Sequence, residues 1–325
     1  MKLNINKRHL LLSFTMCLLC FLFGFQETVN AQDSTGAATV KPAPAKVKPV
    51  KNTFESLWII DNQTVMVPQK GTFEMEIMHR FGTTENGYDD FWGLFAPSNI
   101  RLGASYSPIN NLFIGIGITK SNMLWDASAK YALMKQTKGQ YPVSITYYGN
   151  MGYDTRKDPD GSLFKYNSQR LIFFNQLIIA RKVTDKFSIQ VAPSVSHQNA
   201  VNGYYTKNDS TGTSTYKEME FNHFAIAISG RYKLTNVTSV MVNYDQPLTK
   251  HNQNNPNPNL SFGFEFSTSS HSFQIFAGSY GLLSPQRNNL YNDTNPFGSY
   301  TDAAGNKHEG HQFRIGFNIT RLWNY

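Results

Sequence analysis

Residues 311–325, the final segment of the chain, alternate between apolar and polar positions. The apolar positions are Phe313, Ile315, Phe317, Ile319, Trp323 and Tyr325. The positions between the first of them carry Gln312, Arg314, Gly316, Asn318 and Thr320. Successive side chains of a β-strand point to opposite faces, so this pattern predicts a strand with one apolar face.

An aromatic residue closes this predicted strand. A terminal strand that is apolar on one face and ends on an aromatic residue resembles the assembly signal of bacterial outer-membrane β-barrels. The residues that carry the resemblance are Phe317, Ile319, Trp323 and Tyr325. The expected partners are then outer-membrane lipid and the barrel assembly machinery. A soluble β-sandwich is the alternative fold.

Alternation recurs along the chain and predicts twelve strands. We place them near 72–82, 98–107, 111–120, 125–135, 141–153, 168–182, 186–198, 220–233, 237–246, 259–269, 272–281 and 311–325. An even number of strands is typical of bacterial single-chain barrels. The predicted fold is therefore an all-β, transmembrane, antiparallel up-and-down barrel over residues 72–325.

The links between the predicted strands differ in length at the two ends of the barrel. Tight links lie at 108–110, 136–140, 183–185, 234–236 and 270–271. The alternate links are long and polar, the longest at 282–310, and the link at 121–124 is the exception. Short turns face the periplasm and long loops face the outside in such barrels. Both ends of the barrel are then expected in the periplasm.

Strand parity assigns the side chains to the two faces of the wall. The residues expected to face lipid are Leu112, Ile114, Ile116 and Ile118, then Tyr141, Val143, Ile145 and Tyr147, then Leu260, Phe262, Phe264 and Phe266. Aromatic residues near strand ends suit an interfacial girdle, namely Tyr106, Trp125, Tyr141, Trp323 and Tyr325. The strand at 168–182 is apolar on both faces, so its orientation stays open.

Three segments precede the predicted barrel. Basic residues followed by an apolar run predict a signal peptide over residues 1–31, cleaved after Ala31. Residues 32–53 are rich in Lys and Pro and predict an extended periplasmic tail, a possible contact for a periplasmic protein. Residues 54–71 are expected to lie against the periplasmic mouth, where partial plugging is an open alternative.

Composition excludes several classes of site. No run of eighteen apolar residues follows the leader, so no transmembrane helix is expected. The net charge of +8 could suggest nucleic acid, but in a secreted barrel it fits anionic lipid and a basic lumen better, and no nucleic-acid partner is expected. Both cysteines, Cys17 and Cys20, lie in the predicted leader. The mature chain then lacks disulfides and thiolate-bound metals, and no cofactor is expected.

Charged side chains on the inward parity indicate where function should be sought. They are Glu74, Glu76, Arg80, Arg101, Asp126 and Lys130. Turning an Arg or Lys toward mid-bilayer lipid costs about 2–4 kcal/mol. Gly117 is expected beside Arg101, and Gly115 beside Lys130, which leaves room for the long side chains. Two hypotheses stay open: a neutralising network that fills the interior, and a basic constriction that favours anionic solutes.

Catalytic and metal sites have weaker support. A membrane phospholipase needs a Ser nucleophile, a His base and an orienting group. Ser194, Ser196, His197 and Asn199 lie near one strand end, but His197 has the lipid-facing parity and both serines the inward parity. Residues 158–161 could bind calcium, or could form a turn. We therefore expect no enzyme activity, no catalytic residue and no metal site.

A series of short motifs runs through the first part of the chain. They are Glu55-Ser56, Asn62, His79-Arg80-Phe81-Gly82, Phe91-Trp92-Gly93-Leu94, Asn99-Ile100-Arg101-Leu102-Gly103, Gly115-Ile116-Gly117, Lys130-Tyr131, Lys135-Gln136 and Pro142-Val143-Ser144. In this order they resemble a Bacteroidota family of outer-membrane β-barrel proteins of unknown function. The resemblance extends from Phe54 to the C terminus, and it departs at 123–129, where a more polar segment is expected. It implies location and fold, and it brings no catalytic residues.

The sequence therefore predicts an outer-membrane β-barrel, as a narrow pore or as a barrel that binds a small solute. The first alternative is a structural or docking component of an envelope complex. The second is a phospholipase-like membrane enzyme.

Overall fold

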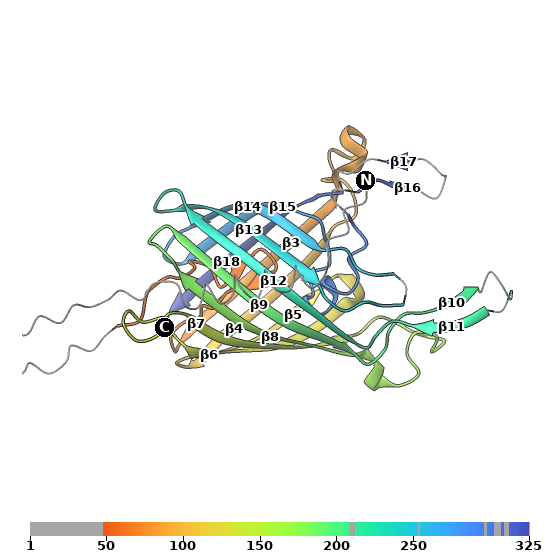
Figure 1. Ribbon diagram of the computed structural model, residues 1–325, viewed down its shortest axis with the longest axis horizontal. Helices are drawn as coiled ribbons and strands as arrows, with labels where there is room; N and C mark the ends of the chain where they lie inside the picture. Colours follow the sequence, from red (N-terminus) through yellow and green to blue (C-terminus); the bar gives the residue numbers. More distant parts are fainter. Residues whose placement is uncertain are drawn as a thin grey trace, which may run out of the picture.

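In the part of the chain that the computed structural model describes, twelve strands form one closed barrel (Figure 1). The described residues are 48–207, 212, 214–252, 254–295, 298–301, 307–308 and 312–324. The barrel strands are β3 (Thr72–Thr83), β4 (Asn99–Ile109), β5 (Leu112–Thr119), β6 (Leu124–Met134), β7 (Ser144–Asp154), β8 (Leu171–Lys182), β9 (Phe187–Gln198), β12 (Asn222–Lys233), β13 (Thr238–Pro247), β14 (Asn259–Ser267), β15 (His271–Gly278) and β18 (Arg314–Asn324). All neighbours are antiparallel, and β18 pairs with β3 to close the sheet. The predicted all-β barrel is confirmed.

The two rims of the barrel differ in the length of their links. One rim, called the short-turn rim, carries the links 110–111, 135–143, 183–186, 234–237 and 268–270. The other, called the long-loop rim, carries 84–98, 120–123, 155–170, 199–221, 248–258 and 279–313. Thr72 and Asn324, near the two ends of the barrel sequence, pair at the short-turn rim. The predicted asymmetry is confirmed, with its one short exception at 120–123.

The links of the long-loop rim hold small elements of their own. They are η1 (Thr84–Asp90), η2 (Ser121–Met123), η3 (Asn167–Arg170), β10 (Gly203–Lys207), β11 (Ser214–Glu218), α2 (Pro285–Asn288), β16 (Tyr300–Thr301) and β17 (Lys307–His308). The β10–β11 hairpin projects beyond the barrel (Figure 1). Within the described residues, no helix has the length and apolar character needed to cross a membrane.

The barrel wall alternates between an exposed and a buried face. In β5, Ile114 and Ile116 are exposed, whereas Thr119 is buried. In β14, Phe264 is exposed and Glu265 is buried. An apolar outer surface and a polar interior are the two environments that a membrane barrel offers to successive residues. The predicted alternation in these strands is confirmed.

Two predicted positions are wrong. Val143, expected to face lipid, is only 3% exposed, because β7 begins at Ser144 and the residue before it belongs to the preceding turn. Gly115 does not lie opposite Lys130. Lys130 pairs with Phe113 instead, and Gly115 lies between serines of the two neighbouring strands.

The segment before the first barrel strand lies inside the lumen. β1 (Trp58–Ile59) and β2 (Asn62–Gln63) form an antiparallel hairpin there (Figure 1, the red-orange trace). Residues 54–67 are called the lumen hairpin. Its buried apolar side chains are Phe54, Leu57, Trp58, Ile59, Ile60 and Val65. The sequence predicts this segment against the mouth of the barrel, whereas the structure places it deeper, between the walls.

The lumen hairpin explains the strand whose orientation the sequence leaves open. On β8, Phe174 and Ile178 point inward and share one buried cluster with Ile60 and Val65 of the hairpin. On the same strand, Leu177 is exposed on the outer face. The strand is therefore apolar outside because it faces lipid, and apolar inside because it packs against the hairpin.

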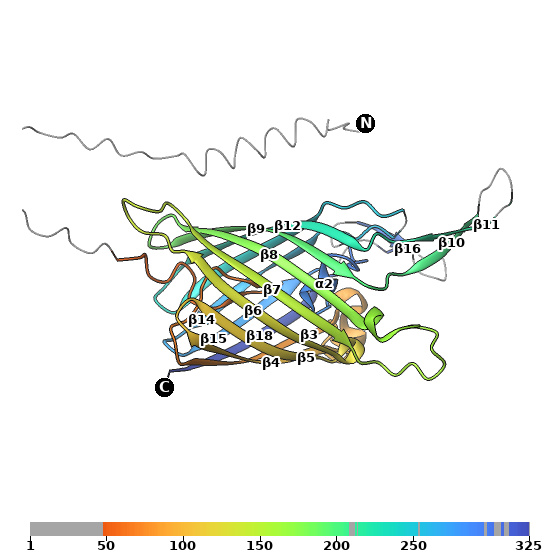
Figure 2. The ribbon, with the colours of Figure 1, turned by 90° about the horizontal axis from the view of Figure 1, so that it is seen from below.

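A second insert enters the barrel from the long-loop rim. Residues 279–292, which include α2, are called the inner loop, and Figure 2 shows α2 among the barrel strands. Gln286 of α2 donates a hydrogen bond to Asn150 on β7. Leu283 belongs to a buried cluster with Leu57 and Trp58 of the lumen hairpin. The two inserts therefore meet inside the barrel and fill the middle of the lumen.

Candidate functional site

A buried ion-pair cluster joins three strands of the wall. Arg101 on β4 donates from Nε and Nη2 to the carboxylate of Asp126 on β6, at 3.1 and 2.8 Å. Its Nη1 pairs with Glu76 on β3. Asn150 on β7 adds a hydrogen bond to Asp126 at 2.9 Å. We call Glu76, Arg101 and Asp126 the wall cluster, in which one cation faces two carboxylates.

Glycines leave the space that the wall cluster occupies. A Cβ on Gly117 would collide with the guanidinium of Arg101, and a Cβ on Gly103 would collide with the carboxylate of Glu76. The predicted position of Gly117 beside Arg101 is confirmed. The matching role of Gly103 was missed, although its strand register opposite Glu76 follows the same logic.

Lys130 joins the wall to the lumen hairpin. Its Nζ donates to Oε1 of Gln63 at 2.7 Å and to the backbone carbonyls of Thr64 and Leu57 at 3.3 and 3.5 Å. Glu74 is buried and attracts Lys130 electrostatically. Because Lys130 is only 1% exposed and its ammonium faces hairpin oxygens, it does not line an open channel.

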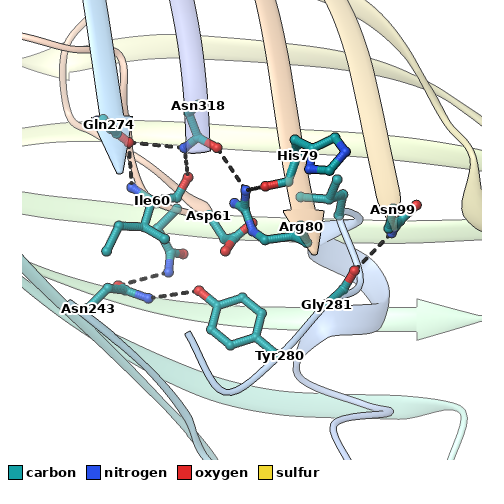
Figure 3. A network of polar contacts seen from close by, with 12 residues as sticks. Ile60, Asp61, His79, Arg80, Asn99, Asn243, Gln274, Tyr280, Gly281 and Asn318 are labelled. Carbon is teal, nitrogen blue, oxygen red and sulfur yellow. Dashed lines mark hydrogen bonds and ion pairs between the residues drawn. The ribbon is translucent and has the colours of Figure 1, made fainter. Parts of the chain in front are cut away.

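Arg80 holds the tip of the lumen hairpin, as Figure 3 shows. Its Nη2 lies 2.7 Å from Oδ1 of Asp61. Its Nη1 donates to Oδ1 of Asn318 at 3.0 Å and to the carbonyl oxygen of His79 at 2.7 Å. The guanidinium also stacks over Phe276, 4.3 Å from the ring centroid. All six charged residues predicted for the lumen are therefore buried. Five of them pair with the hairpin or with one another, and Glu74 attracts Lys130 and Arg101 electrostatically.

Two glutamines of the wall bind the backbone of the hairpin. Gln274 accepts from the N–H of Ile60 at 3.1 Å and donates to the carbonyl of Trp58 at 2.8 Å (Figure 3). Gln190 accepts from the N–H of Val65 at 3.0 Å. Buried backbone groups require such partners. The hairpin is therefore held by polar bonds as well as by its apolar cluster.

A cavity of about 530 Å³ lies at the long-loop mouth and is called the mouth cavity. Its charged lining consists of Arg80, Lys120, Arg287, Arg314 and Asp293. Among the described residues, four cationic side chains thus face this space with one carboxylate. Its floor includes Tyr280, whose hydroxyl accepts a long hydrogen bond from Asn243 at 3.5 Å (Figure 3).

Sequence parity finds some residues of this cavity and misses others. Arg80 is predicted in the lumen from its place on the first barrel strand. Arg314 occupies a polar position of the last strand, so its inward direction could have been inferred in the same way. Arg287 lies on the inner loop, where no strand periodicity reports its position. Asp61 was missed because the hairpin was expected at the mouth.

The residues considered for catalysis lie on different faces of β9. Ser194 and Ser196 are buried toward the interior. His197 has the opposite parity and contacts Asn222 and Asn199 at 2.8 and 3.0 Å. A serine–histidine hydrogen bond, which nucleophile activation needs, is not made by these residues.

Asp158, considered for calcium, organises its own loop. Its carboxylate accepts from the N–H groups of Leu163 and Phe164. Desolvation works in the opposite direction, but these backbone bonds hold the pKa of the Asp158 carboxyl below its ordinary value. The contacts are those of a turn.

Three residues of the predicted assembly signal, Phe317, Ile319 and Trp323, lie on β18. Phe317 stacks with His79 on the neighbouring strand at 5.1 Å between ring centroids. Ile319 is exposed on the outer face, and Trp323 packs on Phe73 at 5.5 Å. Tyr325 lies outside the described residues.

Comparison with known proteins identifies the family. Residues 54–323 match the family described as "Membrane bound beta barrel domain". The chain belongs to this family. The family description agrees with the closed barrel and with the exposed apolar side chains on the outer face of its strands. No curated protein matches the sequence.

Solved barrels with similar shapes have little sequence in common with this family member. The NanC porin is 9% identical, with a TM-score of 0.42 over 78% of this chain and 99% of that chain. An outer membrane channel from Pseudomonas putida F1 is 12% identical, with a TM-score of 0.44 over 79% and 97%. The KdgM porin is 9% identical, with a TM-score of 0.41 over 77% and 98%. We draw no argument about function from them.

Proposed function

We propose that this membrane-bound barrel lies in the outer membrane of a Bacteroidota cell, with the short-turn rim in the periplasm. The asymmetry of the links and the apolar outer face support this location. Cleavage after Ala31 and recognition of the outward residues of β18 by the barrel assembly machinery belong to the same proposal.

Within that membrane, we propose that the barrel binds a small solute at its outer mouth. The observation that carries this proposal is the mouth cavity, which lies above a lumen filled by two inserts. Its volume of about 530 Å³ falls in the range of small-molecule pockets, about 300–1,000 Å³. The solute passes inward only when the lumen hairpin moves.

The contacts of the lumen hairpin set the cost of that movement. Its bonds to Lys130, Gln190 and Gln274 can be exchanged for bonds to water at modest cost. Its buried apolar side chains cost more, about 1.5–3 kcal/mol for each large one that becomes exposed. We therefore expect a barrel that is closed at rest and opens rarely.

Solute flux into liposomes tests this gate. Replacing residues 55–66 by a short Gly/Ser linker should give faster, unregulated flux of small sugars, because only the inner loop then remains inside the barrel. The wild-type protein should give slow flux. Cysteines at Val65 and Thr146, whose contact is 2.8 Å between the Thr146 hydroxyl and the Val65 carbonyl, can be joined by oxidation or by a short thiol crosslinker.

Crosslinking should abolish the slow flux, and reduction of a disulfide should restore it. Each variant is first checked for the heat-modifiable gel mobility of a folded barrel. Equal flux in the wild-type and crosslinked proteins would contradict a moving hairpin. Unchanged flux after removal of the hairpin would show that it does not close the lumen.

The second candidate is a docking component of an envelope complex. The described chain leaves the barrel at the short-turn rim, where the N–H of Val50 bonds to the carbonyl of Gln136 at 2.8 Å. We propose that the preceding residues contact a periplasmic protein. Deletion of residues 32–47 favours docking if a specific periplasmic crosslink disappears while solute flux is unchanged. We propose no catalytic role.

A further inference from the structure

Three arginines of the mouth cavity have an unsatisfied hydrogen-bond donor. The Nε atoms of Arg80, Arg287 and Arg314 are buried and have no hydrogen-bond partner among the described residues. Nearly all buried polar groups in proteins are hydrogen-bonded, and an exception calls for an explanation such as a bound ion. All three side chains belong to the lining of one cavity, so the unsatisfied donors lie around the mouth cavity and are not an isolated feature of one residue.

Carboxylates outside the cavity lining offset part of this positive charge, since Asp61 pairs with Arg80 at 2.7 Å and Glu85 attracts Arg314 electrostatically. Asp154 lies 3.7 Å from Arg287, but it pairs more closely with Arg156, at 2.8 Å. Asp293, on the cavity wall, attracts Arg314 electrostatically. A cavity with this lining attracts an anion and repels a small cation.

The cavity also offers an unsatisfied acceptor. Oδ1 of Asn288 is buried without a partner in the described part of the chain, and Asn288 belongs to the cavity lining. An amide oxygen accepts a hydrogen bond from a hydroxyl group. Tyr291 lies in the same lining, and its ring packs on the guanidinium of Arg287 at 4.9 Å. Donors for an anion and an acceptor for a hydroxyl thus meet in one space.

We propose that the mouth cavity binds a small hydroxylated oxyanion, such as a sugar acid or a sugar phosphate. This inference rests on the proposed function and names the class of solute. The planar guanidinium of arginine matches carboxylate and phosphate oxygens. The oxyanion binds the guanidinium groups of Arg80, Arg287 and Arg314, whose side chains turn their Nε donors toward it, and a hydroxyl of the solute donates to Asn288.

Calorimetric titration of the full-length protein in a phosphate-free, non-ionic detergent tests the inference. The probes are D-glucuronate, D-glucose 6-phosphate and, as the neutral control, D-glucose. The two acids should bind, and glucose should give no measurable heat. The absence of lipid phosphate from the detergent ensures that binding reports the added solute.

Variants assign the binding to the arginines. Arg314→Gln should weaken binding of both acids about tenfold or more, the usual effect of losing a hydrogen bond to a charged group. Arg287→Lys keeps the charge but removes the planar donor set, and it should also weaken binding. Lys165→Gln is the matched control, because Lys165 is exposed on a loop of the same rim outside the cavity, and it should bind as the wild type does.

The outcomes separate this inference from the proposed function. Ser98→Trp fills the cavity and should abolish binding of both acids. If glucose binds as tightly as glucuronate and Ser98→Trp abolishes both, the cavity binds solutes but does not select oxyanions. If neither acid binds, or if binding survives Arg314→Gln and Ser98→Trp in folded protein, the oxyanion site is wrong. A loss shared by Lys165→Gln would also overturn it.

Discussion

The buried arginines of the wall cluster and those of the mouth cavity differ in how completely their side chains are paired. Arg101 faces the carboxylates of Glu76 and Asp126, so its charge is balanced inside the wall. Around the mouth cavity, Arg80, Arg287 and Arg314 each keep a buried Nε donor that has no partner in the described part of the chain. A buried charge that is balanced by opposite charges belongs to the architecture. A buried donor set without partners indicates a place for a ligand.

This difference changes where anion selectivity should be sought. The sequence allows a basic constriction around Arg101, but two carboxylates and the lumen hairpin surround that part of the wall. The excess of cations lies nearer the long-loop rim, where Arg80 is shared between the cavity and Asp61 of the hairpin. The structure therefore favours a neutralising network at Arg101 and a cationic surface at the mouth.

The largest expected effect comes from breaking the wall cluster. Arg101→Ala leaves Glu76 and Asp126 buried together without their cation. Removing one partner of a buried ion pair costs about 3–5 kcal/mol. Urea unfolding in detergent, followed by heat-modifiable gel mobility, should show a correspondingly lower midpoint.

A neutral version of the wall cluster is the control for this loss. The triple variant Glu76→Gln, Arg101→Gln and Asp126→Asn removes the three charges together, and it should recover most of the stability. Arg314→Gln should change the midpoint little, because it removes a poorly paired donor. Wild-type stability of Arg101→Ala, combined with raised conductance and a lower anion preference, would restore the constriction hypothesis.

A smaller effect is expected where the two regions share Arg80. Asp61→Asn removes the carboxylate that binds Nη2 of Arg80 at 2.7 Å while the amide oxygen can keep a hydrogen bond. We expect a stability loss of about 1–3 kcal/mol. The affinity for D-glucuronate should rise several-fold, because more of the charge of Arg80 acts on the cavity.

Flux measurement sharpens this prediction. A weaker attachment of the hairpin tip should also increase liposome flux in Asp61→Asn. Asp160→Asn is the control. Asp160 lies on an exposed loop of the same rim, and its substitution removes an equal charge. Lower glucuronate affinity in Asp61→Asn than in Asp160→Asn would mean that Asp61 orders Arg80 for binding instead of competing for it.

Most of the fold could be predicted because lipid and a polar interior impose a period of two on every strand. In β14, phenylalanines lie on the outer face and Glu265 lies on the inner face, so the period of two is visible in the sequence. The inward apolar side chains of β8 do not fit it, since their environment is the lumen hairpin. That environment is made by a segment more than a hundred residues away, so the local pattern could not reveal it.

The candidate site was less accessible from the sequence. Parity finds Arg80 and Arg101, but it cannot separate a paired arginine from an unpaired one. That distinction depends on the inner loop, which places Arg287 inside the barrel. Because this loop is not a strand, no alternation of its residues predicts where Arg287 lies. The partners of Arg101 come from β3 and β6, one and two strands away in the barrel, so strand order could predict them. The unsatisfied donors at the mouth depend on how the interior is assembled.

The smallest effect is expected at Lys120, the exposed cation of the mouth cavity. Its Nζ donates to the carbonyl of Ser98 at 2.8 Å, and Lys120→Gln should change stability within about 0.5 kcal/mol, as for most surface substitutions. Its charge acts on a bound oxyanion across solvent, where the screening length falls from about 10 Å at 0.1 M salt to about 3 Å at 1 M. The glucuronate affinity of Lys120→Gln should therefore be slightly reduced at low salt and equal to that of the wild type at high salt. The loss in Arg314→Gln should persist at both, because it comes from a buried hydrogen bond. If titrations at the two salt concentrations show a large, salt-independent loss for Lys120→Gln, the anion sits at the outer edge of the cavity and not over the buried arginines.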